Sequence, residues 1–474
     1  MGSFVTKLSF SASGTAAGLI SNGISFFLLL YYSQVLGLDP ALAGLALLIS
    51  LAFDAISDPL VGHWSDRLQH RLGRRHPFLL LSILPAGVCY FLLWDPPELG
   101  QLGLFVYLLT VTVLLRFALT LHTVPFNALL PEITTDYEER TRLMNYSYSS
   151  SWFFGTAMAV LMYAYWLADA PGEAPGSGIL RRSGFIEAGL VAALVTGVCL
   201  AVAALGTRRV IPMLAAPPPR PESLATMFRQ GAATLNDSSF FAMLGSGLMS
   251  AAAAGTSTAL WAYMQPYFWG FSSDQTSLIL AAQLLSSVLA FLLLPVLASG
   301  REKKPILVGL SLGSLVVGSG PVFLKLLGAL PAAGSAALFS IMAVVGVLQV
   351  MLIVMTGVVS ASMIADMVES RALATGRREE GLLFAVLSFT AKVASGAGVW
   401  AGGVMLSLVN FPTDTLSTAV PEETVRQLGW VYGPVLAGFY LIGILCLSYY
   451  RLDRASHEDN LRRLRFDGSI EGNS

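Results

Sequence analysis

Long apolar stretches separated by short polar or charged segments occupy most of the chain. A helix needs about 20 predominantly apolar residues to cross a hydrocarbon layer of about 30 Å. The pattern therefore predicts an all-α membrane protein with twelve transmembrane helices. The predicted ranges are 11–36, 40–62, 77–95, 101–131, 143–168, 185–206, 238–269, 274–298, 305–327, 334–365, 380–409 and 425–450.

The composition supports a membrane location. Of the 474 residues, 55% are hydrophobic and 12% are charged, whereas about a quarter are charged in an average soluble domain. A net charge of −1 provides no basic excess for nucleic acid, and Cys89, Cys199 and Cys446 lie in apolar runs that imply neither a disulfide framework nor a zinc site. We expect a multi-pass protein of the cell membrane (the inner membrane in a bacterium), surrounded by lipids and without a cofactor.

The basic residues give the expected orientation. Most of the 28 Lys and Arg residues lie in alternate loops and near the two ends of the chain. The other loops hold only Arg181, Arg182, Lys325 and Arg426. Because Lys and Arg accumulate in cytoplasmic loops, we predict that both termini are cytoplasmic. The N-terminus lacks the ordered features of a signal peptide and should lead into the first helix.

A proline-rich segment at 207–237 divides the predicted helices six and six. We predict an N-terminal bundle at 1–206 with the cation site, a cytoplasmic linker at 207–237, a pseudo-symmetric C-terminal bundle at 238–450 and a cytoplasmic tail at 451–474. Each half looks self-sufficient, so we expect a functional monomer.

The two halves also resemble each other in sequence. RRHPFLLLSILPAG opens the third predicted helix and EKKPILVGLSLG opens the ninth. Such repeats are typical of secondary transporters, whose substrate and ion sites lie near the midplane between the halves. A non-transporting membrane scaffold is the alternative.

Two aspartates in the apolar second helix indicate an ion site. Each costs about 2.5–3.5 kcal/mol at the centre of a membrane helix. Asp54 and Asp58 are four residues apart and share one helix face, and two such close carboxylates require either a cation or a proton. Pro59 donates no hydrogen bond to the carbonyl of Ala55, which becomes a candidate ligand. Further candidate oxygen ligands are the hydroxyls of Ser57 and Thr120.

Lys392 lies about twelve residues from either end of its predicted helix. A lone ammonium at this depth should pair with Asp54 or Asp58 when no cation is bound. We therefore expect Lys392 to compete with the coupling cation. The alternatives are that Lys392 extends to an interface, or that basic residues hold the acids permanently.

Several motifs resemble known transporters. GHWSDRLQHRLGRRHP resembles the Gly-x-x-x-Asp-Arg-x-Gly-Arg-Arg loop of the major facilitator superfamily, with extra residues between Arg67 and Gly73. YYSQVLGL, FDAISDPLVG, HTVPFNALLPEITTDYEERT and GLLFAVLSFTAKVASG resemble the glycoside-pentoside-hexuronide:cation symporter family. That family includes the melibiose permease and, more distantly, the sodium-dependent lysophosphatidylcholine symporter of animals. The resemblance implies cation-coupled symport by alternating access and no enzymatic activity.

The resemblance places a cation site, for sodium or a proton, on Asp54, Asp58, Ser57 and Thr120, and it matches Lys392 to a family lysine. The melibiose permease has an asparagine at the position of Ser57, which leaves the choice of cation open. Its three charged sugar ligands align with Gly18, Thr123 and Tyr148, so none of them is present here.

The function predicted from these features is symport of a small organic solute, a glycoside or related sugar. The alternative is symport of a lysophospholipid or another amphiphile or organic anion. The candidate substrate-binding residues are Asn22, Arg116, His122, Thr123, Asn127, Tyr148, Trp261, Gln265 and Gln349. Arg116 suits either an anionic substrate group or an ion pair with a helix-2 acid. Trp269 is expected in an interfacial aromatic belt.

Charged residues near the predicted cytoplasmic helix ends form a candidate gate. The resemblance implies that they close the inward face through salt bridges. The residues are Asp66, Arg67, Arg74, Arg75, Glu132, Arg140, Asp366 and Arg377. A solvated charged loop is the alternative, because exposed pairs contribute only about 0–1 kcal/mol each.

Overall fold

The computed structural model describes residues 4–134, 136–213, 238–299, 301–375, 380–413 and 419–450. At residues 137, 212–213, 368–375 and 380–385 it describes the backbone alone. The described part is helical, which confirms the all-α fold class. Much of the predicted linker and all of the predicted tail lie outside the described residues, and the proposed domain limits stay predictions.

Each of the twelve predicted ranges contains a helix within the described residues. The N-terminal helices are α1 Phe4–Gly23, α2 Pro40–Arg67, α3 His76–Trp94, α4 Gln101–Ile133, α5 Tyr137–Leu161 and α6 Arg182–Gly206. The C-terminal helices are α8 Ser238–Tyr263, α9 Ser273–Gln283, α10 Leu285–Ala298, α11 Lys303–Leu326, α12 Ala336–Thr375, α13 Glu380–Leu408 and α14 Glu422–Ser448. The range 274–298 is divided between α9 and α10.

Nine helical segments of the described chain are long and apolar enough to cross a membrane. The number of crossings and the cytoplasmic placement of the termini stay predictions.

Local sequence accounts for several helix starts. Asp39 caps α2 by accepting from the backbone N–H groups of Ala41 and Leu42, and Pro40 occupies the first turn. Ser272 and Gln275 form a capping box on α9.

Helices at corresponding places in the two halves end in π-helical turns. In the first half, η1 (Ile24–Leu28) and η2 (Tyr31–Val35) follow α1. In the second half, η6 (Met264–Trp269) follows α8. A further π-turn, η3 (Met162–Trp166), follows α5. Wider turns of this kind are frequent at functional sites, and here they lie where the two halves meet.

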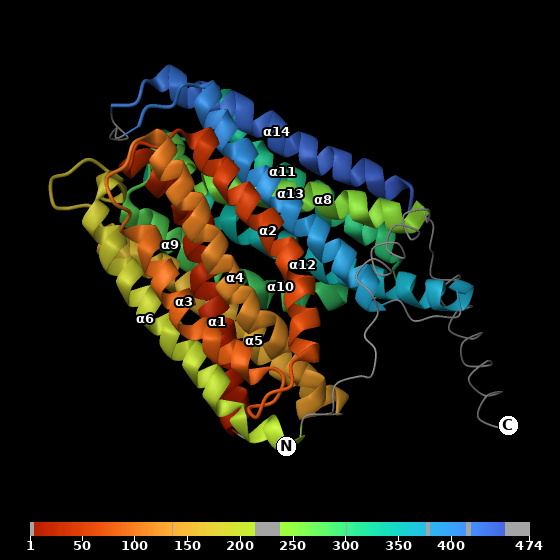
Figure 1. The fold of residues 1–474 in the computed structure, drawn as a ribbon. Helices are drawn as coiled ribbons and strands as arrows, with labels where there is room; N and C mark the ends of the chain where they lie inside the picture. Colours follow the sequence, from red (N-terminus) through yellow and green to blue (C-terminus); the bar gives the residue numbers. More distant parts are fainter. Residues whose placement is uncertain are drawn as a thin grey trace.

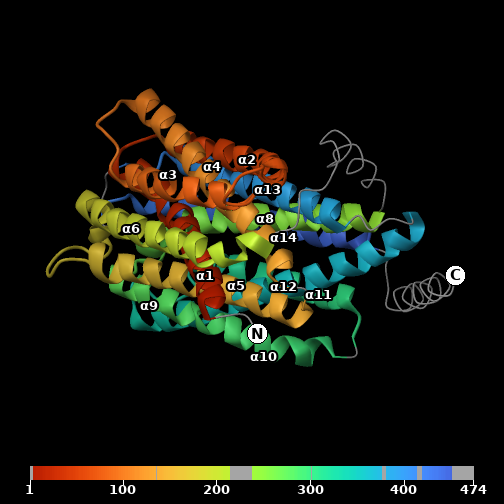
Figure 2. The ribbon, with the colours of Figure 1, turned by 60° about the horizontal axis from the view of Figure 1, so that its bottom comes forward.

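The two helix bundles meet at one end of the molecule and diverge towards the other. Figure 1 shows α1–α6 descending from the upper left, while α8, α13 and α14 run from the same region to the right. In Figure 2, α3 and α4 lie on one side and α9 and α10 on the other, with α1, α5 and α8 between them. We call the meeting end the closed end and the opposite end the open end.

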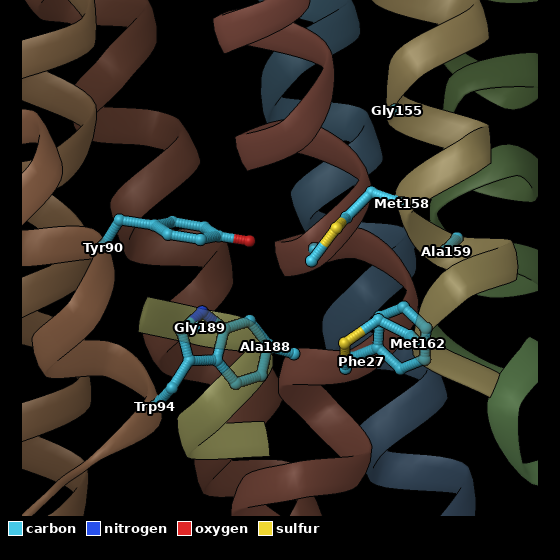
Figure 3. Close-up of a pocket in the computed structure, with 10 residues that line it drawn as sticks. Phe27, Tyr90, Trp94, Gly155, Met158, Ala159, Met162, Ala188 and Gly189 are labelled. Carbon is cyan, nitrogen blue, oxygen red and sulfur yellow. The ribbon is translucent and has the colours of Figure 1, made fainter. Parts of the chain in front are cut away.

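Glycines allow close helix packing inside the first bundle. A Cβ on Gly189 would lie 2.5 Å from the Trp94 ring, and a Cβ on Gly23 would touch the Tyr90 hydroxyl. The pocket between these residues has a volume of only about 10 Å³, roughly enough for one water molecule. Figure 3 shows Phe27 and Met162 facing Trp94 across it. This pocket is a packing feature rather than a substrate site.

Candidate functional site

The predicted acidic pair lies between the bundles, where α2 contacts α13. Lys392 Nζ donates to Oδ2 of Asp54 at 2.8 Å and to Oδ2 of Asp58 at 2.5 Å. Thr120, on α4, donates to Oδ1 of the same two residues at 3.0 and 3.2 Å. The structure therefore brings four predicted residues from three helices into one cluster. We call Asp54, Asp58, Thr120 and Lys392 the carboxylate cluster.

The two remaining predicted cation ligands flank this cluster. The Ser57 hydroxyl donates to the backbone oxygen of Asp54 at 3.1 Å and lies 3.4 Å from Thr120 Oγ1. Ala55 is buried, and α2 continues as an α-helix through Pro59. Coordination by the Ala55 carbonyl stays a prediction.

Arg116 adds a second positive charge beside the cluster. Its Nη1 lies 3.8 Å from Oδ2 of Asp54, and its Nε donates to the Ser50 hydroxyl at 3.1 Å. The ion pair that the sequence offered as one interpretation of Arg116 is therefore formed. Ser50, one helical turn before Asp54, was not identified from the sequence, because a serine in a membrane helix is an ordinary residue.

Two cavities lie near the carboxylate cluster. The larger, of about 400 Å³, lies between the bundles and extends among α8, α9, α11, α12 and α14. Among the described residues that line it, none is charged. Its polar walls are formed by amide and hydroxyl side chains, and most of its aromatic residues carry a polar atom. The amides are Asn22, Gln265, Gln283 and Gln349, and the aromatic residues that carry a polar atom are Trp152, Trp261, Trp269, Tyr432 and Tyr440.

Two of these amides present oxygen atoms without a donor. Oε1 of Gln265 and Oε1 of Gln349 are buried and accept no hydrogen bond from the described residues. The Gln349 amide nitrogen is held by Tyr440, to whose hydroxyl it donates at 3.0 Å. A buried acceptor without a donor costs about 1–3 kcal/mol, so either oxygen would favour a hydroxyl or N–H group once a side-chain rotation exposes it to the cavity.

A smaller cavity of about 230 Å³ lies between the larger one and the carboxylate cluster. The two cavities share the lining residues Ser25, Ala254 and Thr258. Of the described residues that line the smaller cavity, Arg116 alone is charged. Arg116 therefore contacts Asp54 and also lines a space next to the larger cavity.

Comparison with known proteins identifies the group to which these features belong. Residues 9–454 match the family model described as MFS/sugar transport protein. The chain belongs to this family. An uncharacterized symporter of Synechocystis sp. is 26% identical, over 98% of this chain and 96% of its own length. The putative glycoside/cation symporter YagG of Escherichia coli is 25% identical, over 97% and 94%.

More distant comparisons agree on the fold. The sodium-dependent lysophosphatidylcholine symporter 1-A of Danio rerio is 32% identical over 32% of this chain and 29% of its own length. The nucleoside transporter NupG has a TM-score of 0.64 at 12% identity, with 94% of this chain and all of that chain covered. The chain is thus a membrane symporter of the MFS family, which confirms the resemblance, the transport class and the membrane location.

The structure separates the predicted substrate residues into two groups. Asn22, Trp261, Gln265 and Gln349 line the larger cavity, and Arg116 lines the smaller one. The other predicted residues lie outside both linings. These are His122, Thr123, Asn127 and Tyr148.

The local contacts explain why these residues lie elsewhere. His122 is fully buried, 3.2 Å from Ser13 Oγ, and stacks on Phe126. Thr123 donates to the Leu119 carbonyl of its own helix. Asn127 is exposed, as is Tyr148.

The interfacial position expected for Trp269 is wrong. Its side chain is 4% exposed and lines the larger cavity, at the last residue of the π-helical turn η6. Apart from Pro266, no residue pattern indicates this turn.

At the open end, the described charged pairs join helices of the same bundle. Arg74 Nη2 and Arg75 Nη2 each lie 2.5 Å from Glu132 Oε1, and Asp66 lies 3.6 Å from Arg75. Burial lowers the pKa of the Arg75 guanidinium, and the adjacent Glu132 opposes this effect. In the second bundle, Lys303 lies 2.7 Å from Asp366.

The remaining predicted gate residues are more peripheral. Arg140 Nε donates to the Thr134 carbonyl at 2.8 Å, and Arg67 is exposed at the end of α2. Arg377 lies outside the described residues. The described pairs therefore connect the segment before α3 to α4, and α11 to α12 through Lys303, which was not predicted. The closure of the inward face stays a prediction.

At the closed end, several hydrogen bonds join the two bundles. Gln34 Nε2 donates to the Pro412 carbonyl at 3.0 Å, and the Ser33 and Tyr263 hydroxyls are hydrogen-bonded. Ser407 Oγ donates to Asp39 Oδ2 at 3.3 Å.

A second group of closed-end contacts joins the loop after η3 to the start of α9. Asp169 accepts from both the backbone N–H and the hydroxyl of Ser273, at 3.1 Å each. The sequence offered no basis for predicting these pairs, because each joins segments far apart in the chain.

Proposed function

We propose that the protein couples the movement of a cation, sodium or a proton, to the uptake of a small organic solute, a glycoside or related sugar. The observation that carries this proposal is the carboxylate cluster, which lies at the bundle interface and close to a cavity with uncharged amide and aromatic walls. Buried acids at such an interface are typical of ion-coupled carriers.

The cation is proposed to replace Lys392. Two close carboxylates at low dielectric require a neighbouring positive charge or a proton. Lys392 supplies this charge in the present state, so the carrier is charge-compensated without a bound cation. Entry of sodium or a proton would release Lys392, and its return would allow the carrier to reorient with an unoccupied cation site.

The larger cavity is proposed to hold the solute. Amide side chains form hydrogen bonds with neutral hydroxyl groups, and the acceptor oxygens of Gln265 and Gln349 have no donor among the described residues. The name of the relative YagG, a putative glycoside/cation symporter, agrees with a sugar-like solute. The absence of charge among the described lining residues favours a neutral solute over an anionic one.

The second candidate is an amphiphilic or anionic solute. Arg116 in the smaller cavity favours it, because a guanidinium binds carboxylate or phosphate groups. A relative of this chain from Danio rerio is named a sodium-dependent lysophosphatidylcholine symporter. The charged group of such a solute would have to compete with Asp54 for Arg116. The neutral solute is therefore preferred.

The difference between the closed end and the open end supports transport by alternating access. The bundles contact at the closed end and diverge at the open end, and the positive-inside prediction makes the open end cytoplasmic. We therefore interpret this state as inward-open. Release of the closed-end hydrogen bonds would accompany the change to the outward-open state.

The test is uptake into proteoliposomes with and without an inward sodium or proton gradient. The solutes are nitrophenyl galactoside, glucoside, xyloside and glucuronide, together with lysophosphatidylcholine. We expect gradient-dependent uptake of at least one neutral glycoside and its loss in Asp58→Asn. Asp95→Asn, which removes the same charge from an exposed loop pair, is the control. Gradient-driven uptake that survives in Asp58→Asn would refute the cation site, and lysophosphatidylcholine or glucuronide uptake alone would favour the second candidate.

A further inference from the structure

The neighbourhood of the carboxylate cluster contains two acids and two bases. Asp54 and Asp58 together require two positive charges, and Lys392 and Arg116 provide them. One lysine would suffice to occupy the position between the acids, since it contacts both. The additional arginine therefore changes how many further cations the acids can accept.

The two bases are held differently. Arg116 is the more buried, with 15% of its side chain exposed, and it pairs with the buried Asp54. It is also bonded to Ser50. Lys392 and Asp58 are more open, at 29% and 31% exposed. A guanidinium keeps its charge in proteins and a lysine has a flexible stem, so Lys392 is the base that can leave.

Resting on the proposed cation coupling, we propose that Arg116 is a fixed counter-charge that limits the acids to one exchangeable cation, so that Lys392 and the coupling cation exclude each other. With Arg116 present, the acids are neutralised by either Lys392 or one monovalent cation. Both together would leave an excess positive charge in a poorly solvated site. Without Arg116, the two acids would accommodate Lys392 and a cation at the same time.

This charge balance matters for coupling. If Lys392 stayed paired with the acids after the cation binds, the ion pairs made by α13 would be the same with and without the cation. Exclusion makes the release of Lys392 obligatory whenever the cation binds. Arg116 also lines the smaller cavity, so the same guanidinium lies next to the larger cavity that is proposed to hold the solute.

The test is a double-mutant cycle on sodium binding by the purified protein, measured with radioactive sodium at fixed pH. We expect Lys392→Gln to tighten sodium binding about tenfold in the presence of Arg116, because the competitor is removed. In the Arg116→Gln background, the same change should alter binding less than about threefold, a clear departure from additivity. Arg116→Lys should retain the tenfold effect, since it keeps the charge.

Arg426→Gln is the matched control, because it removes an arginine from an exposed pair far from the site. A second measurement needs no variant: sodium should increase the reaction of Lys392 with an amine-reactive reagent, read by mass spectrometry. The inference is overturned if sodium binds without exposing Lys392, or if the two substitutions act additively. A wild type that responds to neither sodium, lithium nor a pH step would overturn the proposed cation coupling as well, so the two failures are distinguishable.

Discussion

The closed end and the open end of this symporter are held together by different chemistry. At the closed end, the bundles are joined by hydrogen bonds such as Gln34 to Pro412 and Asp169 to Ser273. At the open end, the described ion pairs lie within one bundle, as between Arg75 and Glu132. The carboxylate cluster lies between the two ends.

This difference separates two tasks. Contacts within a bundle stabilise that bundle in every conformation, so they can be strong. In the proposed transport cycle, contacts between bundles must break. A neutral hydrogen bond contributes only about 0.5–1.5 kcal/mol, and one to a carboxylate such as Asp169 about 1.5–3 kcal/mol. Substitutions at the open end should therefore affect stability, whereas substitutions at the closed end should affect the conformational equilibrium.

The largest effect is expected for Glu132→Gln. Its carboxylate lies against two arginines, and Arg75 in particular is buried. Loss of one partner of a buried pair costs about 3–5 kcal/mol because the remaining charges are left uncompensated. Thermal unfolding should show a large loss of stability in the first bundle, while the spin-label distance between the bundles at the closed end stays unchanged.

Glu423→Gln is the control for this experiment, because Glu423 pairs with Arg426 at 4.0 Å on the exposed surface. Its loss should cost at most about 1 kcal/mol. A Glu132→Gln variant that keeps its thermal stability but opens the closed end would contradict the division of tasks.

The features that sequence analysis predicted are those governed by local rules. Asp54 and Asp58 stand out because charge in an apolar helix is costly, and their spacing places them on one face. Lys392 stands out by its depth in a helix. Hydrophobic length located the helices, and the resemblance suggested which residues meet across them.

The features that it missed depend on how helices rotate against one another. Tyr148 and Asn127 are polar residues in helices, yet they lie outside the lining of both cavities. Trp269 is buried at the end of a π-helical turn that, apart from Pro266, no sequence pattern indicates. Ser50 matters only because Arg116, from another helix, reaches it.

The next largest effect is expected for Gly403→Val, at the crossing of α2 and α13. A Cβ at Gly403 would overlap the Pro40 carbonyl, and a Cβ at Gly44 would lie 2.9 Å from Trp400 Cα. Overpacking costs about 1–3 kcal/mol, here in the closed-end state alone. The ratio of molecules with this end opened to molecules with it closed, read from spin-label distances, should rise about 5- to 150-fold, and uptake should fall.

Gly438→Val on α14 is the matched control, because a Cβ there meets no atom within 4 Å. It should leave the distance distribution unchanged. If both substitutions shift the distribution equally, the effect comes from valine in a helix and not from the crossing.

The smallest effect is expected for Asp169→Asn, which tests whether a single loop carboxylate contributes to closure. Asp169 accepts from the N–H groups of Gly176 and Gly178 in its own loop and from Ser273 at the start of α9. In asparagine, the amide nitrogen would face N–H donors, and the side chain would keep one acceptor oxygen in place of two. It would also lose the favourable interaction of a negative charge with the start of α9.

We expect Asp169→Asn to weaken closure by about 1 kcal/mol, roughly a fivefold shift in the fraction of opened molecules. Ser273→Ala separates the two roles of the carboxylate. It removes the hydroxyl donor from the second bundle and leaves the bonds of Asp169 to Gly176 and Gly178 in place. If Asp169→Asn lowers thermal stability and neither variant changes the inter-bundle distance, then Asp169 shapes only its own loop. A shift in both variants, larger for Asp169→Asn, would show that the carboxylate helps to hold the two bundles together.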